Sequence, residues 1–360
     1  MAEHLIHVRS LHSEALARRN DGKIFDGVTH EYNVSEFQGY GGHFEAFVIE
    51  QLRTHQDVAA IEPDQHWTFD GVPANPGPMV QANAAWHLSQ ISHRELGTGN
   101  EGYVYNTEAH GTFAYIIDGG ITPEHQEFSA RNGRARSGFD IVKGGNGQDL
   151  HGHGTHVAAL IGGKTFGVAK DATLISVKVF EGAECTTRRF LKGYEYATKS
   201  IRGTKSQAHS VINVSIGGGW SWAMNRAVTA ASKKGITTVV SAGNSNKKTC
   251  WTKNAIVVGA ADATRRRAKF SNFGSSVALF APGVNIRSAW TGYGNDRTLT
   301  ISGTSQAAPL VAGVILTLKA TQHLPDHKST RDALLKLATP NVVGDANGSP
   351  NLFLYNGSGR

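Results

Sequence analysis

The sequence predicts an α/β protein with a largely parallel sheet between two helical layers, preceded by a small α+β domain. From residue 113 onward, short runs rich in Val and Ile alternate with amphipathic segments of helical period. Strands buried on both faces form continuous apolar runs, and their alternation with helices is typical of a parallel sheet. The chain has 360 residues, 39% of them hydrophobic, which is enough for one large and one small domain.

The small domain is expected at residues 1–70. Its alternating and amphipathic segments predict strands at 4–8, 32–37 and 58–61 and helices at 13–19 and 43–53. Prolines and glycines cluster in the following residues, and because they prevent regular structure we expect a linker at 71–80.

The large domain is expected at residues 81–360. We expect its strands at 113–117, 174–179, 211–216, 236–241 and 255–259. We expect helices at 153–161, 188–199, 223–234 and 331–338, and a buried helix around the apolar run 310–318. In such a sheet the functional site forms at the carboxyl ends of the strands, which is where Asp118, Ser215 and Asn244 fall.

Ser305 stands between small residues at the start of the buried helix. The free N–H groups and the positive end of the helix dipole would favour an oxyanion beside its hydroxyl. A serine in this position is by itself more often a helix cap than a nucleophile. A nucleophilic role therefore needs a base and a carboxylate elsewhere in the chain.

Two other stretches supply those groups. Asp118 follows the apolar run 114–117 and precedes two glycines, so its carboxylate would emerge at the end of a strand. His153 lies where a loop enters a helix. A hydroxyl becomes a nucleophile when an imidazole takes its proton and a carboxylate orients and stabilises that imidazole. The groups follow one another in the order Asp, His, Ser.

These motifs resemble the signatures of the subtilisin-like serine proteases, peptidase family S8, and most closely those of the fungal proteinase K-like enzymes. The histidine and serine signatures are matched by His153-Gly154-Thr155-His156 and by Gly303-Thr304-Ser305 with Pro309. The family's substrate-binding segments are matched by Ser215, Ile216, Gly217 and Gly218 and by Ser241, Ala242 and Gly243. Its oxyanion asparagine is matched by Asn244. The resemblance spans residues 2–357 and implies a three-layer subtilisin-like fold.

The resemblance also implies a serine endopeptidase. His153 would take the proton of Ser305 as the hydroxyl attacks a peptide carbonyl, and Asp118 would orient the imidazole. Asn244 and the N–H of Ser305 would hold the oxyanion. The segment 215–218 would pair with an extended peptide as an added strand. A broad preference for apolar or aromatic side chains is all that the resemblance implies about specificity.

Residues 1–70 resemble the inhibitor-type (I9) propeptide of the same proteases, above all at 37–44 and 58–64. The resemblance implies a ferredoxin-like domain that helps the protease to fold and then occupies its cleft. Cleavage would fall near Pro78-Met79, but proline is a poor residue to precede a subtilisin cut. The cut would then shift within 67–77, or the propeptide would stay attached.

Several positions depart from the family pattern. Gly119 replaces a hydroxyl residue, so one hydrogen bond near Asp118 is expected to be missing. Gln306 replaces a methionine, which would change the packing or the wall of the pocket. The loop 246–254 is shorter than in the family.

We expect no cofactor and no metal in the site. Ala278 stands where the proteinase K-like enzymes have a calcium-binding aspartate, so we expect the family's strong calcium site to be absent and leave a weak one open. The histidines at 151, 153 and 156 lack the HExxH arrangement and an intervening carboxylate, so they are not expected to bind a metal.

Charge divides the chain in two. Residues 1–78 hold 5 Lys and Arg against 12 Asp and Glu, and the remainder holds 31 against 17. Opposite charges favour docking of the two parts by an attraction that salt screens. Seven of the 17 histidines lie in the first part, and their protonation at about pH 6 would loosen that docking. The run 265–267, three arginines, fits a solvated loop, and without interleaved aromatics nucleic acid is not an expected partner.

No apolar run approaches the ~20 residues of a membrane span, and the N-terminus lacks the basic and apolar regions of a signal peptide.

Cys185 and Cys250 are expected to be free thiols rather than a bridge. We expect a monomer whose partners are a peptide or protein substrate and its own propeptide, with no membrane contact. The compartment stays open.

Three functions follow from these observations, and a serine endopeptidase made as a zymogen is preferred. The second is a diverged enzyme that keeps its propeptide and performs acyl transfer or ring closure, motivated by the linker, Gly119 and Gln306. The third is a non-catalytic regulator, against which the intact set of Asp118, His153, Asn244 and Ser305 argues.

Overall fold

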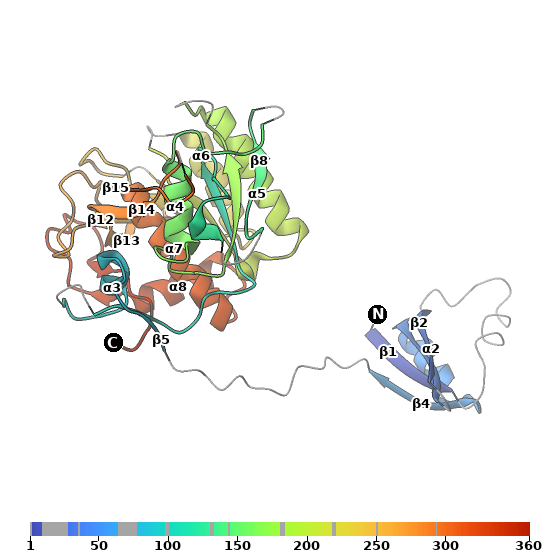
Figure 1. Cartoon of the computed structure of the whole chain (residues 1–360). Coiled ribbons are helices and arrows are strands. Elements are labelled where there is room, and N and C mark those ends of the chain that lie inside the picture. The colour runs from blue at the N-terminus through green and yellow to red at the C-terminus, as the bar shows by residue number, and fades with distance from the viewer. Residues whose placement is uncertain are drawn as a thin grey trace. The chain divides into compact units, whose positions relative to one another are not determined.

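The computed structural model describes residues 2–8, 28–34, 37–63, 78–97, 101–129, 133–142, 145–180, 184–217, 221–249, 251–292 and 294–360. The chain divides into two compact units, Met1–Asn75 and Pro76–Arg360 (Figure 1). The helix expected at 13–19 lies outside the described residues, as do the linker residues 71–77 and Gly218.

The first unit is a sheet with a helix packed against it. Among its described residues the strand order is β2-β3-β1-β4, and each neighbouring pair is antiparallel. The strands are β1 (Ala2–Val8), β2 (Val28–Val34), β3 (Phe37–Phe44) and β4 (Val58–Pro63). Helix α2 (Ala46–Arg53) packs Val48, Ile49 and Leu52 against Tyr40 and Phe44. The expected small α+β domain is therefore present.

Two expected boundaries in this unit are wrong. The strand expected at 32–37 is the end of β2 and the first residue of β3, and the helix expected at 43–53 begins only at Ala46. Glycines at 39, 41 and 42 do not interrupt β3, because the strand lies between β1 and β2 and both neighbours pair with its backbone.

In the described part of the chain, the second unit contains a nine-stranded sheet of order β16-β17-β13-β12-β11-β10-β7-β9-β8. Its strands are β7 (Phe113–Asp118), β8 (Ala135–Asp140), β9 (Thr173–Lys178), β10 (Ser210–Val214), β11 (Thr238–Ser241), β12 (Ile256–Ala261), β13 (Val277–Pro282), β16 (Thr339–Pro340) and β17 (Leu352–Phe353). Every neighbouring pair is parallel except β16 with β17. The largely parallel sheet is confirmed.

Two small antiparallel pairs lie outside this sheet. Strand β5 (Met79–Gln81) pairs with β6 (Tyr103–Tyr105), and β14 (Ile286–Ala289) pairs with β15 (Thr298–Ile301). The short helix α3 (Trp86–Ile91) lies between β5 and β6 in the chain.

The large sheet is the middle of three layers (Figure 1). Ala114 and Ile116 of β7 belong to the core that contains α4 (His153–Gly162) and α7 (Thr304–Thr321). Tyr115 and Ile117 belong to the core that contains α5 (Thr187–Gly203) and α6 (Trp222–Ser232). Since successive side chains of a strand point to opposite faces, the two cores cover the two faces of the sheet.

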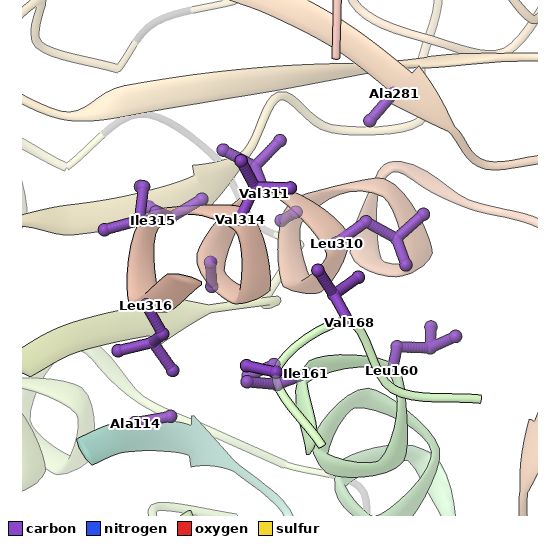
Figure 2. Packing of buried hydrophobic residues seen from close by; sticks show 14 of the residues in the cluster. Ala114, Leu160, Ile161, Val168, Ala281, Leu310, Val311, Val314, Ile315 and Leu316 are labelled. Carbon is purple, nitrogen blue, oxygen red and sulfur yellow. The ribbon is translucent and has the colours of Figure 1, made fainter. Parts of the chain in front are cut away.

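Helix α7 runs through the larger core, and its residues from Thr304 to Lys319 are all buried. Figure 2 shows Val311, Val314 and Ile315 on one side of the helix and Leu316 on another, with side chains of α4 nearby. Each fully buried aliphatic side chain stabilises the fold by roughly 1.5–3 kcal/mol. No helix in the described residues combines the length and the apolar character that crossing a membrane requires.

The final helix, α8 (His327–Leu337), starts earlier than the expected residue 331. Asp326 and Ser329 form a capping box, in which Asp326 accepts from the backbone N–H of Ser329 at 2.7 Å and the hydroxyl of Ser329 accepts from the backbone N–H of Asp326 at 3.3 Å. This capping box begins the helix before the amphipathic residues from which its start was expected.

Two of the three arginines at 265–267 are buried, so the expectation of a solvated loop is wrong for Arg265 and Arg267 and holds only for the exposed Arg266. Arg265 is 3% exposed and donates to the backbone carbonyls of residues 93, 94 and 95. Arg267 is 8% exposed and binds the carboxylate of Asp345 at 2.9 Å. Both guanidinium groups therefore join segments that are distant in the sequence.

Candidate active site

The polar ends of three neighbouring strands meet at one edge of the large sheet. Strand β10 lies between β7 and β11 and is parallel to both. β7 ends at Asp118, β10 ends directly before Ser215, and β11 ends at Ser241. The carboxyl ends of parallel strands are the usual place for a site in an α/β sheet, and the predicted residues gather there.

Asp118 and His153 contact each other directly. The Nδ1 atom of His153 lies 2.8 Å from Oδ1 and 3.0 Å from Oδ2 of Asp118. A Cβ atom on Gly154 would lie 2.1 Å from the carbonyl oxygen of Gly120, so the glycine lets the first turn of α4 pack onto the end of β7. The backbone N–H of Gly119 donates to Oδ1 of Asp118 at 2.7 Å.

This contact changes the acidity of the imidazole. Burial lowers the pKa of His153, but the charge and hydrogen bond of Asp118, together with the charge of Asp149, outweigh it and hold that pKa above its ordinary value. The imidazolium is therefore stabilised in this position, which suits a group that receives a proton during a reaction.

Ser305 is the second residue of α7, and Pro309 shapes its surroundings. Proline has no N–H, so the carbonyl of Ser305, four residues earlier, has no helical donor. It accepts instead from the hydroxyl of Ser215 at 3.1 Å, and the hydroxyl of Ser305 donates to the carbonyl of Ser215 at 3.2 Å. Within the described residues Ser305 makes no hydrogen bond to His153.

Asn244 presents its amide nitrogen beside Ser305. Its Oδ1 accepts from the N–H and the hydroxyl of Thr304, at 2.9 and 2.8 Å, and this network assigns Nδ2 to the other side. A Cβ atom built on Gly303 would lie 2.7 Å from Oε1 of Gln306, 3.4 Å from Nδ2 of Asn244 and 3.6 Å from the N of Ser305. The amide nitrogen of Asn244 and the backbone nitrogen of Ser305 therefore lie near each other beside Gly303, with the side-chain oxygen of Gln306 next to the same point.

Asn272, which the sequence did not indicate, holds the loop of Asn244 in place. Its Oδ1 accepts from the N–H groups of Ser245 and Lys247, both at 3.0 Å. Its Nδ2 donates to the carbonyl of Ala242 at 2.9 Å. The sequence does not reveal this role of Asn272. Its side chain bonds to backbone groups of another loop, and such contacts produce no local residue pattern.

A pocket of about 280 Å³ lies beside these groups. Residues 216–217 and 241–243 form part of its wall, together with Cys185, Met224 and Trp251, and none of its lining residues in the described chain is charged. A Cβ on Gly217 would meet no atom within 4 Å, so its backbone is open to a ligand. Ser215 does not line the pocket but lies behind it, bonded to Ser305.

Asp149 is a second buried carboxylate near His153, and the sequence did not indicate it. It is 2% exposed and accepts from the N–H groups of His151, Gly152 and Thr155 at 3.0, 2.8 and 2.8 Å. The side chain of Lys178 donates to the adjacent carbonyl of Gln148 at 2.6 Å. The loop before α4 is thus fixed by charged side chains on both sides.

His156 has a structural environment. It is fully buried, and its Nε2 lies 3.2 Å from the carbonyls of Ile286 and Leu299. Burial, with the nearby charge of His153, lowers the pKa of His156 to about 3, so it stays neutral. It therefore joins α4 to the β14–β15 pair.

The side chain at position 278 bears on the expected loss of a calcium site. Ala278 lies buried in β13, and its methyl group supplies no oxygen ligand. Within the ranges that the structure describes, no three side chains of His, Cys, Asp and Glu group together as a metal ion would require.

Comparisons with known proteins agree with this geometry. The model of the Subtilase family, Peptidase_S8, matches residues 109–357, and the model of Peptidase inhibitor I9 matches residues 1–70. Alkaline protease 1 of Aspergillus clavatus is 40% identical over 363 residues, which cover 99% of this chain and 87% of that protein. The alkaline proteinase of Hapsidospora chrysogena is 40% identical over 366 residues, with 99% and 88% covered.

A solved structure is similar as well. The crystal structure of a cold adapted subtilisin-like serine proteinase superposes with a TM-score of 0.70 at 36% identity. The match covers 76% of this chain and 99% of the other.

Proposed function

The chain belongs to the subtilase family of serine endopeptidases with an I9-type propeptide, and on that premise we propose that Asp118, His153 and Ser305 form its catalytic triad. The observation that carries the proposal is the 2.8 Å contact between Nδ1 of His153 and Asp118. It fixes the tautomer that leaves Nε2 free to accept a proton.

The proposed reaction begins when the hydroxyl of Ser305 leaves the carbonyl of Ser215 and turns to Nε2 of His153. The imidazole takes the proton as the serine oxygen attacks a peptide carbonyl carbon. Asp118 stabilises the imidazolium, which then gives its proton to the leaving amine. A water molecule repeats the sequence on the acyl-enzyme and releases the second product.

The proposed oxyanion donors are Nδ2 of Asn244 and the N–H of Ser305. The two bonds that Oδ1 of Asn244 accepts from Thr304 leave Nδ2 to donate elsewhere, and this supports the assignment. The extended substrate would pair with the segment 215–218, and Ser241, Ala242 and Gly243 would form the opposite wall. The uncharged lining of the pocket supports an uncharged side chain next to the scissile bond.

The propeptide is proposed to end in the segment 71–80, which is supported by the division of contacts between Asn75 and Pro76.

We expect the protein to act as a monomer and without the family's strong calcium site, for which the methyl group of Ala278 is the support. The burial of Arg265 and Arg267 supports the expectation that nucleic acid is not a partner. A weak calcium site stays open.

Gly119 and Gln306, which motivated an acyl-transfer or cyclising enzyme, leave the contact between Asp118 and His153 intact. No observation favours that alternative or a non-catalytic regulator.

The test is labelling by a fluorophosphonate together with intact mass over time. Wild type is expected to be labelled on Ser305 and to cut itself once in the linker, and Ser305→Ala is expected to do neither. Ser302→Ala is the matched control, because its exposed hydroxyl lies three residues away and accepts only from the N–H of Asn285. Hydrolysis that survives in Ser305→Ala would refute the proposed triad.

A further inference from the structure

We propose that Asp149 is a positioning residue for the catalytic base: it holds the turn that carries His153 and places a second negative charge close to the imidazole. This inference rests on the proposed role of His153. Asp149 touches neither the substrate nor Ser305, so its effect must pass through the histidine.

The start of α4 needs a side chain from outside the helix. The first N–H groups of a helix have no partner within it, and the residue that precedes the first turn normally supplies a capping side chain. That residue is Gly152, which has none. A side chain is excluded there, because φ is +106° and a Cβ atom would lie 2.4 Å from the indole of Trp290.

Asp149 takes over this capping. Its Oδ1 accepts from the N–H groups of His151 and Gly152, and its Oδ2 accepts from the N–H of Thr155. These three groups lie on both sides of His153 in the chain. The carboxylate therefore fixes the backbone that sets the direction of the imidazole.

The carboxylate itself is anchored to the sheet. Lys178 donates to the carbonyl of Gln148, directly before Asp149, and Lys178 is the register partner of Asp118 in the neighbouring strand. A Cβ atom on Gly120 would lie 2.7 Å from that same carbonyl. The loop of Asp149 and the end of β7 are thus packed together.

Charged and titratable groups of the described residues lie on several sides of the imidazole. On the sheet side lie Asp118 and its register partner Lys178, and in the preceding loop lie Asp149 and His151. On α4 itself lies His156, which stays neutral because its pKa is about 3. Burial lowers the pKa of His153, whereas both carboxylates raise it. Removal of either carboxylate charge should therefore make the histidine a weaker base.

The experiment follows the titration of His153 rather than activity at a single pH. In the full-length Ser305→Ala chain, the imidazole signal of His153 is assigned with His153→Gln and titrated by NMR, with and without Asp149→Asn or Asp149→Ser. Asparagine and serine both remove the charge of Asp149 and keep an oxygen that can accept from N–H groups. The titration of His153 can therefore be compared with the parent if either of the two variants folds. In the active chain, kcat and KM are measured against pH.

Asp140→Asn is the matched control. Asp140, the last residue of β8, accepts from the N–H groups of Val142 and Gly147 in the following loop at 2.8 and 3.0 Å, yet it is not among the groups that shift the pKa of His153. Its replacement disturbs the same loop without removing a charge that acts on the imidazole.

We expect the titration of His153 and the acid limb of kcat/KM to move to lower pH in the Asp149 variants and to stay in place in Asp140→Asn. We also expect kcat to fall about 10–10²-fold with little change in KM, because the base is misplaced. An unmoved titration in a folded Asp149 variant overturns the inference, even if the melting temperature falls. If the fluorophosphonate does not label Ser305 of wild type, the proposed function fails instead.

Discussion

Ser215 and Ser305 are joined by two reciprocal hydrogen bonds, each from the hydroxyl of one to the carbonyl of the other, at 3.1 and 3.2 Å. Because Pro309 removes the helical donor for the carbonyl of Ser305, Ser215 supplies the donor that the helix lacks. The end of β10 is thereby tied to the first turn of α7, and Ser305, the proposed nucleophile, is held next to the segment proposed to bind substrate.

Ser215→Ala is expected to destabilise the fold. The change leaves two buried groups without their partner, the carbonyl of Ser305 and the amide of Asn213, whose Nδ2 lies 3.0 Å from the Ser215 hydroxyl. Losses of this kind cost about 1–3 kcal/mol. The melting temperature is measured in the Ser305→Ala background to prevent self-digestion. Ser129→Ala, which removes an exposed hydroxyl, should change stability by less than about 0.5 kcal/mol; equal losses in both variants would contradict the argument.

Gln306→Met is expected to stabilise the fold. Gln306 is 2% exposed, and its Nε2 atom is buried without a hydrogen-bond partner. A buried unpaired donor costs about 1–3 kcal/mol, and a thioether of similar volume removes it. Gln322→Met, at the exposed end of the same helix, is the control. A melting temperature that does not rise above that of the Ser305→Ala parent would show that the amide is satisfied in solution.

Gly119 and Gly120 should respond in opposite ways to alanine. A Cβ on Gly119 would meet only Oδ1 of Asp149, at 3.6 Å, so Gly119→Ala should fold normally. Gly120 has φ of +119°, and a Cβ there would lie 2.7–2.8 Å from backbone atoms of residues 147–149. Gly120→Ala should therefore cost about 3 kcal/mol or more. Urea unfolding of the two variants compares them directly, and similar midpoints would refute this packing.

Asn244→Ala is expected to lower kcat by ~10²–10³-fold with little change in KM, as for loss of one oxyanion donor. Thr304→Val should also lower kcat, but by less than Asn244→Ala. The hydroxyl of Thr304 donates to Oδ1 of Asn244 at 2.8 Å, so its loss affects the orientation of the amide and leaves the proposed donor in place. Thr304→Ser keeps that hydroxyl and is the control. If Thr304→Ser loses as much kcat as Thr304→Val, the hydroxyl is not what orients Asn244.

Acid is expected to destabilise the protein through buried histidines. Burial lowers the pKa of His87 and His327 to about 4 and that of His156 to about 3, from 6.5. Between these values the unfolded chain binds more protons, so the stability present above pH 6.5 is lost as pH falls. Each histidine contributes about 1.4 kcal/mol per pH unit in this window. His87→Leu should flatten the measured slope of unfolding free energy by that amount, and an unchanged slope would argue against its burial as a neutral group.

Asp118, His153, Ser305 and Asn244 could be named as candidates from the sequence, because each lies in a short motif at the end of a strand or the start of a helix. Their supporting residues were not predictable in the same way. Asp149 and Asn272 act on backbone N–H and C=O groups, and such partners leave no side-chain pattern to find. The reciprocal pair of Ser215 and Ser305 joins positions 90 residues apart.

For the fold, most strands of the large sheet that are buried were predicted, but β13 was missed although all six of its residues are buried. β7 is an apolar run between β9 and β10, and the bounds expected for β7 and β9 differ from the structure by no more than one residue at either end. β8 reads Ala-Arg-Ser-Gly-Phe-Asp, and its edge position explains the polar residues. β3 contains glycines that usually indicate turns, and it is a strand because two neighbours pair with it.

The central position of α7 has a consequence for the order of folding. This helix packs against α4 and against the strands β10 to β13, yet it begins only at residue 304 of 360. During synthesis these strands would emerge long before the element that covers one of their faces. The second unit, Pro76–Arg360, therefore cannot assemble stepwise from its N-terminal end. Its folding must wait for contacts between distant parts of the chain, which are slow to form.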